Sequence, residues 1–447
     1  MVNSIKSRRS GILKLTVSLL LVISLLLLSS CALGPTDEPL SKDELYEAIE
    51  NPGKTSSSNA SKYLDRWGFP KFDITKLNEV QWYFTIHFIE DLPDAYNMAK
   101  SCGKYFLDNY YDAIDITDTE AVTNAIINSY VSSIDDDYAI YRTKAEIDTF
   151  VSDMSGTFCG IGITVEHKKD EGKLTIISVM PGSPAEEAGF RAGDLIHAVD
   201  GSLMSEIGYS NTVDSIRGEE GTPVSLTVIR DGEELTLTAT RRILTEATVQ
   251  YEISDDKIGY IKITQFKENT AEQFGEALEY MSLNEAKGIV FDLRSNPGGY
   301  LSAVINTLDC LVPTGTRIAS YNYAGRETVY TAKNDDALNI PCVVICDEYT
   351  ASAGELFTAA VRDFGAMGLL NECIVGKTTF GKGIMQNTYS LSDGSTITMT
   401  VAYYYPPSVV NYHGIGVKPD SVAERGEDDD GQLKAAFLAI NALLAVN

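Results

Sequence analysis

The chain has 447 residues, which is enough for about three domains. Hydrophobic residues make up 44% and charged residues 22%, a balance that excludes wholesale disorder, a collagen repeat and a coiled-coil rod. The formal net charge of −27 repels phosphate backbones and argues against nucleic-acid binding. We therefore expect a multidomain globular protein of mixed α+β class that does not bind nucleic acid.

Residues 1–30 have the pattern of a secretory signal peptide, with four cations before an uncharged apolar run at 15–28. The run is shorter than the roughly 20 residues of a membrane span. It ends in Leu28-Ser29-Ser30-Cys31, which resembles a bacterial lipobox and implies acylation of Cys31. An uncleaved anchor helix is the alternative. Both predict an extracytoplasmic, membrane-held protein, with residues 31–61 as a tether that contains at most one short helix.

Residues 62–152 are predicted to form a helical N-terminal domain, because apolar residues recur there at helical spacing. We expect Trp82 and the tyrosines of this segment to pack in its core. Six cysteines follow Cys31, far apart and mostly inside apolar runs, which favours buried free thiols over a disulfide framework. Their spacing predicts no zinc site.

Residues 155–243 change character to short β-type runs at 161–166, 174–179, 194–199, 224–230 and 234–239, with helices expected at 184–188 and 211–217. Glycine pairs and an exposed strand edge suit capture of an extended peptide by its terminal carboxylate. The segment resembles a PDZ domain, as the run 181–196 shows in particular. That resemblance assigns peptide binding to the residues Gly160, Ile161, Gly162, Ile163, Val213 and Ile216. An ordinary small β domain with glycine turns is the alternative.

Residues 245–447 are predicted to form an α/β core, because strands at 258–263, 288–293 and 340–345 alternate with helices at 270–281, 300–311 and 352–364. In open α/β sheets, functional side chains gather at the carboxyl ends of the strands. The turns after these strands are therefore where we expect the chemistry.

Ser352 follows the third strand and begins a helix, flanked by small residues that let a substrate backbone approach closely. The start of a helix supplies free N–H groups and a positive dipole, which suit a developing oxyanion. Ser352 could then act as a nucleophile. A simple N-cap role is the alternative.

Lys382 lies between two glycines in an apolar context. If it is desolvated, its pKa falls and the neutral amine can take a proton from a serine hydroxyl. Gln386, four residues on, is expected on the same side of a strand, where it would orient the amine. The alternative is a hairpin turn with Lys382 in water. The same segment fails as a phosphate loop because Gly383 stands where Ser or Thr is required.

The strand at 288–293 ends in a glycine-rich loop, in which Gly298 and Gly299 expose backbone N–H groups. Together with the N–H of Ala353 they could form an oxyanion hole. A tight turn would explain the same glycines.

Three runs in this order behind a PDZ-like module resemble the carboxyl-terminal processing peptidases, serine proteases of family S41: 288–299, 350–355 and 379–383. The likeness extends to 134–138, 258–261 and 414–420. It implies that Ser352 is the nucleophile, Lys382 the general base and Gln386 its orienting partner, and that Glu355 holds a functionally sensitive polar position. The connection at 364–373 is longer than is usual for the family.

The sequence thus predicts a membrane-tethered serine endopeptidase that cleaves polypeptides near their C-terminus and needs no metal or organic cofactor. The PDZ-like module is expected to capture the apolar C-termini of the substrates. His413 is the rival base, because it is the only histidine in the catalytic region. The alternative function is a catalytically inactive PDZ scaffold or chaperone tethered to the membrane. The oligomeric state is open, and a homo-oligomer is compatible with the sequence.

Overall fold

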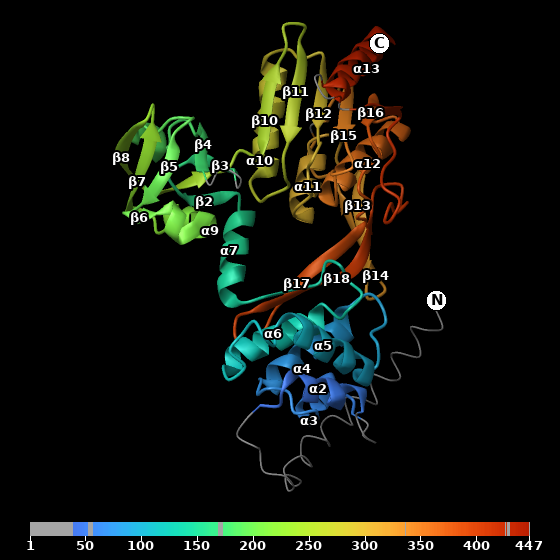
Figure 1. Ribbon diagram of the computed structural model, residues 1–447. Coiled ribbons are helices and arrows are strands. Elements are labelled where there is room, and N and C mark those ends of the chain that lie inside the picture. The colour runs from blue at the N-terminus through green and yellow to red at the C-terminus, as the bar shows by residue number, and fades with distance from the viewer. Residues whose placement is uncertain are drawn as a thin grey trace.

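The computed structural model describes residues 39–51, 57–168, 173–335, 337–424, 426 and 430–446. The predicted signal peptide and the predicted lipidation site Cys31 lie outside the described residues. No helix in the described ranges has both the length and the apolar character that a membrane span requires. Figure 1 shows a helical domain, a β-rich module and an α/β domain, with a long hairpin running between the first and the last.

The N-terminal domain is a packed group of helices, and aspartates begin three of them by accepting N–H groups of the first turn. The helices are α2 (Lys42–Glu50), α3 (Ala60–Arg66), α4 (Ile74–His87), α5 (Ala95–Asn109) and α6 (Thr119–Val131). Leu45 and Ile49 of α2 are fully buried in the same core. The domain therefore begins near residue 42, and the expected tether at 31–61 extended too far.

Trp82 does not pack in this core, contrary to the sequence-based expectation, and 53% of its surface is exposed. The buried residues of α4 are Leu77, Val80 and Phe84, which share one face of the helix. Trp82 lies two residues from Val80 and so projects from the opposite side. Its ring instead contacts Tyr83 and His87 at the edge of the domain.

Strand β1 (Ile140–Arg142) and helix α7 (Lys144–Met154) lead into the β-rich module, in which the strands follow the order β3-β4-β5-β7-β8. Its elements are β2 (Thr157–Gly160), β3 (Ile163–Lys168), β4 (Lys173–Val179), α8 (Pro184–Ala188), β5 (Leu195–Val199), β6 (Ser202–Leu203), α9 (Met204–Ile216), β7 (Pro223–Arg230), β8 (Glu233–Thr240) and β9 (Arg242–Thr245). Helix α9 begins earlier than predicted and is kinked at Gly208. The five predicted strands are confirmed, and β3 lies at a sheet edge.

The α/β domain is built on a six-stranded sheet of order β10-β11-β12-β15-β16-β19, parallel except for the β10–β11 pair. The strands are β10 (Val249–Ile253), β11 (Ile258–Ile263), β12 (Gly288–Asp292), β15 (Cys342–Cys346), β16 (Glu372–Gly376) and β19 (Ser421–Val422). One face packs against α10 (Thr270–Leu283), α11 (Leu301–Asp309) and α12 (Ala353–Ala366), and the other against α13 (Gly431–Val446). The predicted strand–helix alternation is confirmed.

A second, antiparallel sheet was not predicted from the sequence. It contains β13 (Arg317–Tyr323), β14 (Arg326–Thr331), β17 (Ile384–Ser390) and β18 (Thr396–Tyr405), and β18 pairs with β1 of the N-terminal part. Leu391, Ile397 and Met399 of the β17–β18 hairpin are buried in the core of the helical domain. The hairpin therefore joins the helical and α/β domains, as Figure 1 shows.

The six described cysteines are all free thiols, as expected. Cys102, Cys342 and Cys346 are buried, and the other three are half-buried: Cys159, Cys310 and Cys373. Burial raises the pKa of each buried thiol, so these groups stay protonated and act as small apolar core residues.

Candidate active site

Ser352 lies in the turn between β15 and α12, which is fastened to the turn that follows the neighbouring strand β12. The carboxylate of Asp347 accepts the N–H of Ser295 at 2.9 Å. The backbone O of Asn296 accepts the N–H of Ala351, also at 2.9 Å. Because β12 and β15 are parallel neighbours, their two turns meet at one edge of the sheet. The predicted sites around Ser352 and Gly298 are thereby brought together.

The backbone of Ser352 has φ +52° and ψ −116°, a conformation that non-glycine residues rarely adopt. Such a residue costs about 1–3 kcal/mol and persists only where its surroundings fix it. Here the side chain of Glu355 accepts the Ser352 N–H at 2.9 Å. Gly298 packs so closely that an added Cβ would lie 2.7 Å from Cβ of Ser352. The strain is therefore held by specific contacts, as is typical of functional residues.

Glu355 is the centre of the site and is completely buried. One carboxylate oxygen accepts Thr379 Oγ1 and the N–H of Gly381, both at 2.6 Å. The other accepts the N–H of Lys382 at 2.7 Å and that of Ser352. Burial raises the pKa of Glu355, and the four donors oppose that rise. One carboxylate thus ties the serine turn to the lysine loop.

Lys382 precedes β17 and is half-buried, as expected for a desolvated lysine. Burial lowers its pKa, while the carboxylates of Asp136 and Glu355 act in the opposite direction. Its Nζ lies 3.9 Å from the ring centroid of Tyr138, a cation–π contact. Within the part of the chain that the structure describes, no hydrogen bond joins this Nζ to Ser352 or Gln386.

Gln386 does not contact Lys382 through a regular strand, as the sequence suggested. Lys382 comes two residues before β17 begins at Ile384, and the pairing of β17 with β18 shifts between Met385 and Gln386. The extra residue is Val401 of β18, so the alternation within β17 is kept, and the expectation fails because Lys382 lies outside the strand. Gln386 Nε2 instead donates to Thr400 Oγ1 at 3.2 Å.

Two of the candidate oxyanion donors, Ala353 and Gly298, lie against Ser352, whereas Gly299 packs against the backbone of Phe266. Ala353 is the first residue of α12, where an N–H has no partner within the helix. An added Cβ on Gly298 would lie 2.9 Å from the N of Ala353, so the two residues are in contact. The N–H of Gly298 already donates to Asn296 Oδ1 at 2.8 Å. That bond occupies the Gly298 N–H in this arrangement, so Ala353 is the donor that the geometry supports most directly.

Tyr404 is a residue of the site that sequence reasoning missed. Its hydroxyl donates to the backbone O of Lys382 at 2.7 Å. Burial raises the pKa of Tyr404, while hydrogen bonding with Tyr412 and Ser352 opposes the rise. The phenol therefore lies between the candidate nucleophile and the candidate base. No local signal distinguishes it from its neighbours in the run Tyr403-Tyr404-Tyr405.

His413, the rival base, lies in the loop after β18 and stacks edge-on against Tyr403, with 5.8 Å between ring centroids. Its Nδ1 is buried and has no hydrogen-bond partner in the described ranges. A serine–histidine mechanism requires a carboxylate or carbonyl at that nitrogen to orient the ring. The arrangement therefore favours Lys382 over His413.

The candidate peptide-binding residues of the β-rich module lie around the β2–β3 turn and on α9. Ile161 and Gly162 use their carbonyl groups to hold Ala185 and Met180, which fixes the turn. Strand β3, which begins at Ile163, has one paired edge. Val213 is half-buried, but Ile216 is only 7% exposed and packs in the core of the module. Ile216 therefore belongs to the core of the module and forms the floor beneath the candidate peptide-binding surface, where it is not exposed. His167 of β3 stacks on Tyr209 of α9, with 4.8 Å between ring centroids.

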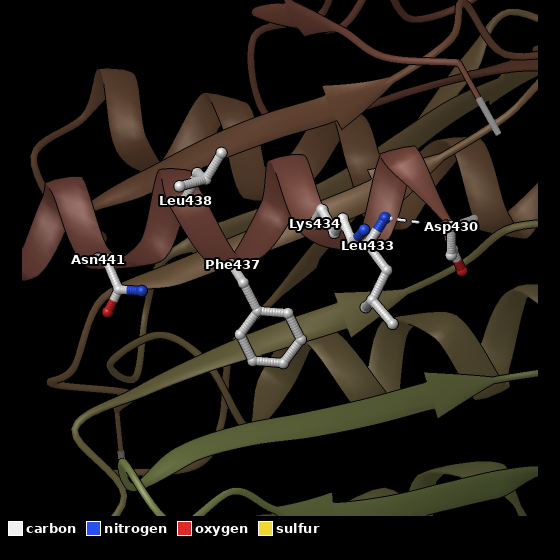
Figure 2. A pocket seen from close by; sticks show the side chains of 6 residues that line it. All are labelled: Asp430, Leu433, Lys434, Phe437, Leu438 and Asn441. Atoms are coloured by element: carbon white, nitrogen blue, oxygen red, sulfur yellow. Dashed lines mark hydrogen bonds between the residues drawn. The ribbon is translucent and has the colours of Figure 1, made fainter. Parts of the chain in front are cut away.

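Other features of the described chain lie apart from this site. No group of three or more His, Cys, Asp or Glu side chains within the described ranges is arranged to hold a metal ion. An open groove of about 450 Å³ runs along α13. Figure 2 shows the side chains that line it, among them Leu433, Phe437 and Leu438. Because α13 covers the opposite sheet face from α12, the groove is separate from Ser352.

Comparison with known proteins identifies the family of this chain. The family model of peptidase family S41 matches residues 257–423, and that of the PDZ domain matches residues 159–240. "Carboxy-terminal processing protease CtpA" of Bacillus subtilis (strain 168) is 34% identical over 337 residues, which are 75% of this chain and 69% of the relative. The chain belongs to the S41 family of carboxy-terminal processing proteases. It is thus a serine peptidase with a PDZ domain.

Two further proteins are similar to this chain. The Staphylococcus aureus (strain N315) protein "Probable CtpA-like serine protease" is 28% identical over 431 residues, 90% of this S41 protease and 85% of the relative. The solved structure of a photosystem II D1 C-terminal processing protease is 24% identical, with a TM-score of 0.45, and covers 78% of this chain and 92% of its own.

Proposed function

We propose that this S41 protease is an endopeptidase that cleaves polypeptides near their C-terminus through a Ser352–Lys382 dyad. The neutral amine of Lys382 takes the hydroxyl proton as Ser352 Oγ attacks the scissile carbonyl carbon. The backbone N–H of Ala353 and that of Gly298 or Gly299 stabilise the oxyanion. The ammonium then protonates the leaving amine as the C–N bond breaks, and water hydrolyses the acyl-enzyme. No step calls for a metal or organic cofactor.

The PDZ domain captures the substrate in this proposal. The turn at 160–163 receives the terminal carboxylate, and the open edge of β3 pairs with the extended peptide. Val213 contacts an apolar side chain of the substrate, above the floor formed by Ile216. Acylation of Cys31 holds the protein at the outer side of a bacterial cell membrane. A homo-oligomer is compatible with this arrangement.

The observation that carries the proposal is the shared carboxylate of Glu355. Its Oε2 accepts the backbone N–H of Ser352 at 2.9 Å and that of Lys382 at 2.7 Å. Two bonds to one oxygen bring these residues within the reach of a lysine side chain. Burial lowers the pKa of Lys382, which suits a base that must be neutral to act. The contact of Nζ with Tyr138 then describes a resting position of the amine.

The test is cleavage of an unfolded protein that ends in apolar residues, with the products identified by mass. We expect no cleavage by the Ser352→Ala and Lys382→Met variants of the full-length protein. Lys377→Met is the matched control, because Lys377 lies in the same segment but pairs at the surface with Glu348 and Glu424. Cleavage by Ser352→Ala would refute the proposal, and absence of cleavage by the wild type would favour an inactive PDZ scaffold.

A further inference from the structure

The β17–β18 hairpin, which carries Gln386, packs against the helical domain, and Thr400 of β18 gives all its polar groups to that contact. The Thr400 N–H donates to Asp136 Oδ2 at 2.9 Å, and Thr400 Oγ1 donates to Asp136 Oδ1 at 3.0 Å. Its carbonyl accepts the N–H of Ile89 at 3.1 Å. All three polar groups of this buried residue are therefore used by the helical domain.

The hydroxyl of Thr400 sets the orientation of the Gln386 side chain. A hydroxyl has one proton to donate, and Thr400 gives it to Asp136. It can therefore only accept from Gln386, whose Nε2 lies 3.2 Å away. Because Nε2 must face Thr400, the amide carbonyl of Gln386 faces elsewhere and is free to accept from the amine of Lys382.

The carboxylate of Asp136 also holds the backbone of Tyr138, whose ring contacts the amine of Lys382. Asp136 Oδ1 also accepts the N–H of Tyr138 at 3.0 Å, which closes the turn between α6 and β1. The Tyr138 ring lies 3.9 Å from Nζ of Lys382. The groups that face this amine are Asp136 and Tyr138 from the turn and Glu355 from α12, while Tyr404 of β18 binds the Lys382 carbonyl.

We propose that Asp136 is a positioning residue of the active site, which orients Gln386 through Thr400 and Lys382 through Tyr138. The inference rests on the Ser352–Lys382 function proposed above. It makes the helical domain a required part of the catalytic machinery, because the alignment of the base depends on a residue outside the α/β domain. The turn at 134–138 thus takes part in aligning Lys382 and Gln386.

Two pairs of variants of the full-length protein test the proposal with a defined peptide substrate. Thr400→Val keeps the shape of the side chain but removes the hydroxyl, and Thr400→Ser keeps the hydroxyl. We expect Thr400→Val to lower kcat by about tenfold to a hundredfold, a fraction of the contribution of a general base, with KM within about twofold. Thr400→Ser should stay within about threefold of the wild type.

Asp136→Asn adds a readout that a purely structural role would not move. The negative charge of Asp136 raises the pKa of Lys382, so the neutral asparagine should lower that pKa. The acidic limb of the kcat profile should move to lower pH while kcat falls. Asp135→Asn is the control, because Asp135 is exposed and its change in charge is identical. That variant should keep the wild-type limb.

The proposal is overturned if Thr400→Val keeps wild-type kcat, or if the limb of Asp136→Asn does not move relative to that of Asp135→Asn. Thermal unfolding of each variant separates loss of fold from loss of alignment. Failure of the dyad itself has a different signature, which is cleavage by the Ser352→Ala or Lys382→Met variants. The two failures are therefore distinguishable.

Discussion

Glu355→Gln is the most informative single substitution, because four donors converge on this buried carboxylate. An amide keeps one acceptor oxygen and turns the other acceptor into a donor, so two of the four bonds are lost. Hydrogen bonds to a charged group contribute about 1.5–3 kcal/mol each, and two amount to about 3–6 kcal/mol. Burial disfavours the charged form of Glu355 and raises its pKa, so removal of the charge offsets part of this destabilisation. We expect a net destabilisation of about 2–4 kcal/mol.

The assay is urea unfolding of the full-length protein, followed by fluorescence, with peptide cleavage measured in parallel. The loss of activity should exceed the loss that unfolding of part of the protein would explain, because the carboxylate that is changed joins Ser352 to Lys382. Glu372→Gln is the matched control: Glu372 is also largely buried, but its Oε2 has no partner in the described ranges. We expect Glu372→Gln to leave cleavage intact and not to destabilise the protein. Wild-type unfolding and cleavage by Glu355→Gln would refute the reasoning.

Further predictions concern backbone space, the identity of the base and the pH dependence of stability. Gly298→Ala should abolish cleavage and lower the free energy of unfolding by about 1–3 kcal/mol, because φ is +100° and the new Cβ would clash with Ser352. Gly232→Ala is the control, because its φ is also positive, at +86°, but its Cβ would meet open space. This variant should lower the urea midpoint and leave cleavage unchanged. The activity of the wild type should rise with pH, with a midpoint below 10.5, because burial lowers the pKa of Lys382. His413→Ala should leave the midpoint of this rise unchanged. A shift of the midpoint in His413→Ala would instead make histidine the base. Burial raises the pKa of Glu372 to about 7 from 4.5, so between these values the folded chain keeps a proton that the unfolded chain loses, and stability falls as pH rises. Urea titrations should show that Glu372→Gln removes about 1–2 kcal/mol of that fall, a value reduced for solvent screening; an unchanged slope would contradict it.

Local patterns predicted the individual elements well because their signals are short-range. The strand at 258–263 and the helix at 184–188 have the predicted bounds, and the α/β alternation holds throughout the sheet. Hydrophobic periodicity and turn chemistry depend on neighbours in the sequence, so one chain is enough to detect them. The same patterns led to Ser352 and Lys382 as candidates, and their catalytic roles remain predictions.

Contacts between distant segments were not predictable in this way. Trp82 was expected in the core, because periodicity identifies an apolar face but not which residues near its border are covered. The link from Asp136 to Thr400 spans 264 residues, and neither residue carries a local mark of its role. Gln386 was expected on one strand with Lys382, but Lys382 precedes β17, and the point where a strand begins depends on its pairing with a partner strand.

The sequence by itself determined the order of the domains, the strand–helix pattern of the sheet and the residue types available for acyl transfer. Only the tertiary structure decided that Glu355 joins the serine turn to the lysine loop, and that the helical domain supports the hairpin beside the base. The physical reason is that side-chain chemistry and periodicity are local properties of a chain. Alignment of reactive groups instead depends on packing between segments that are far apart in sequence.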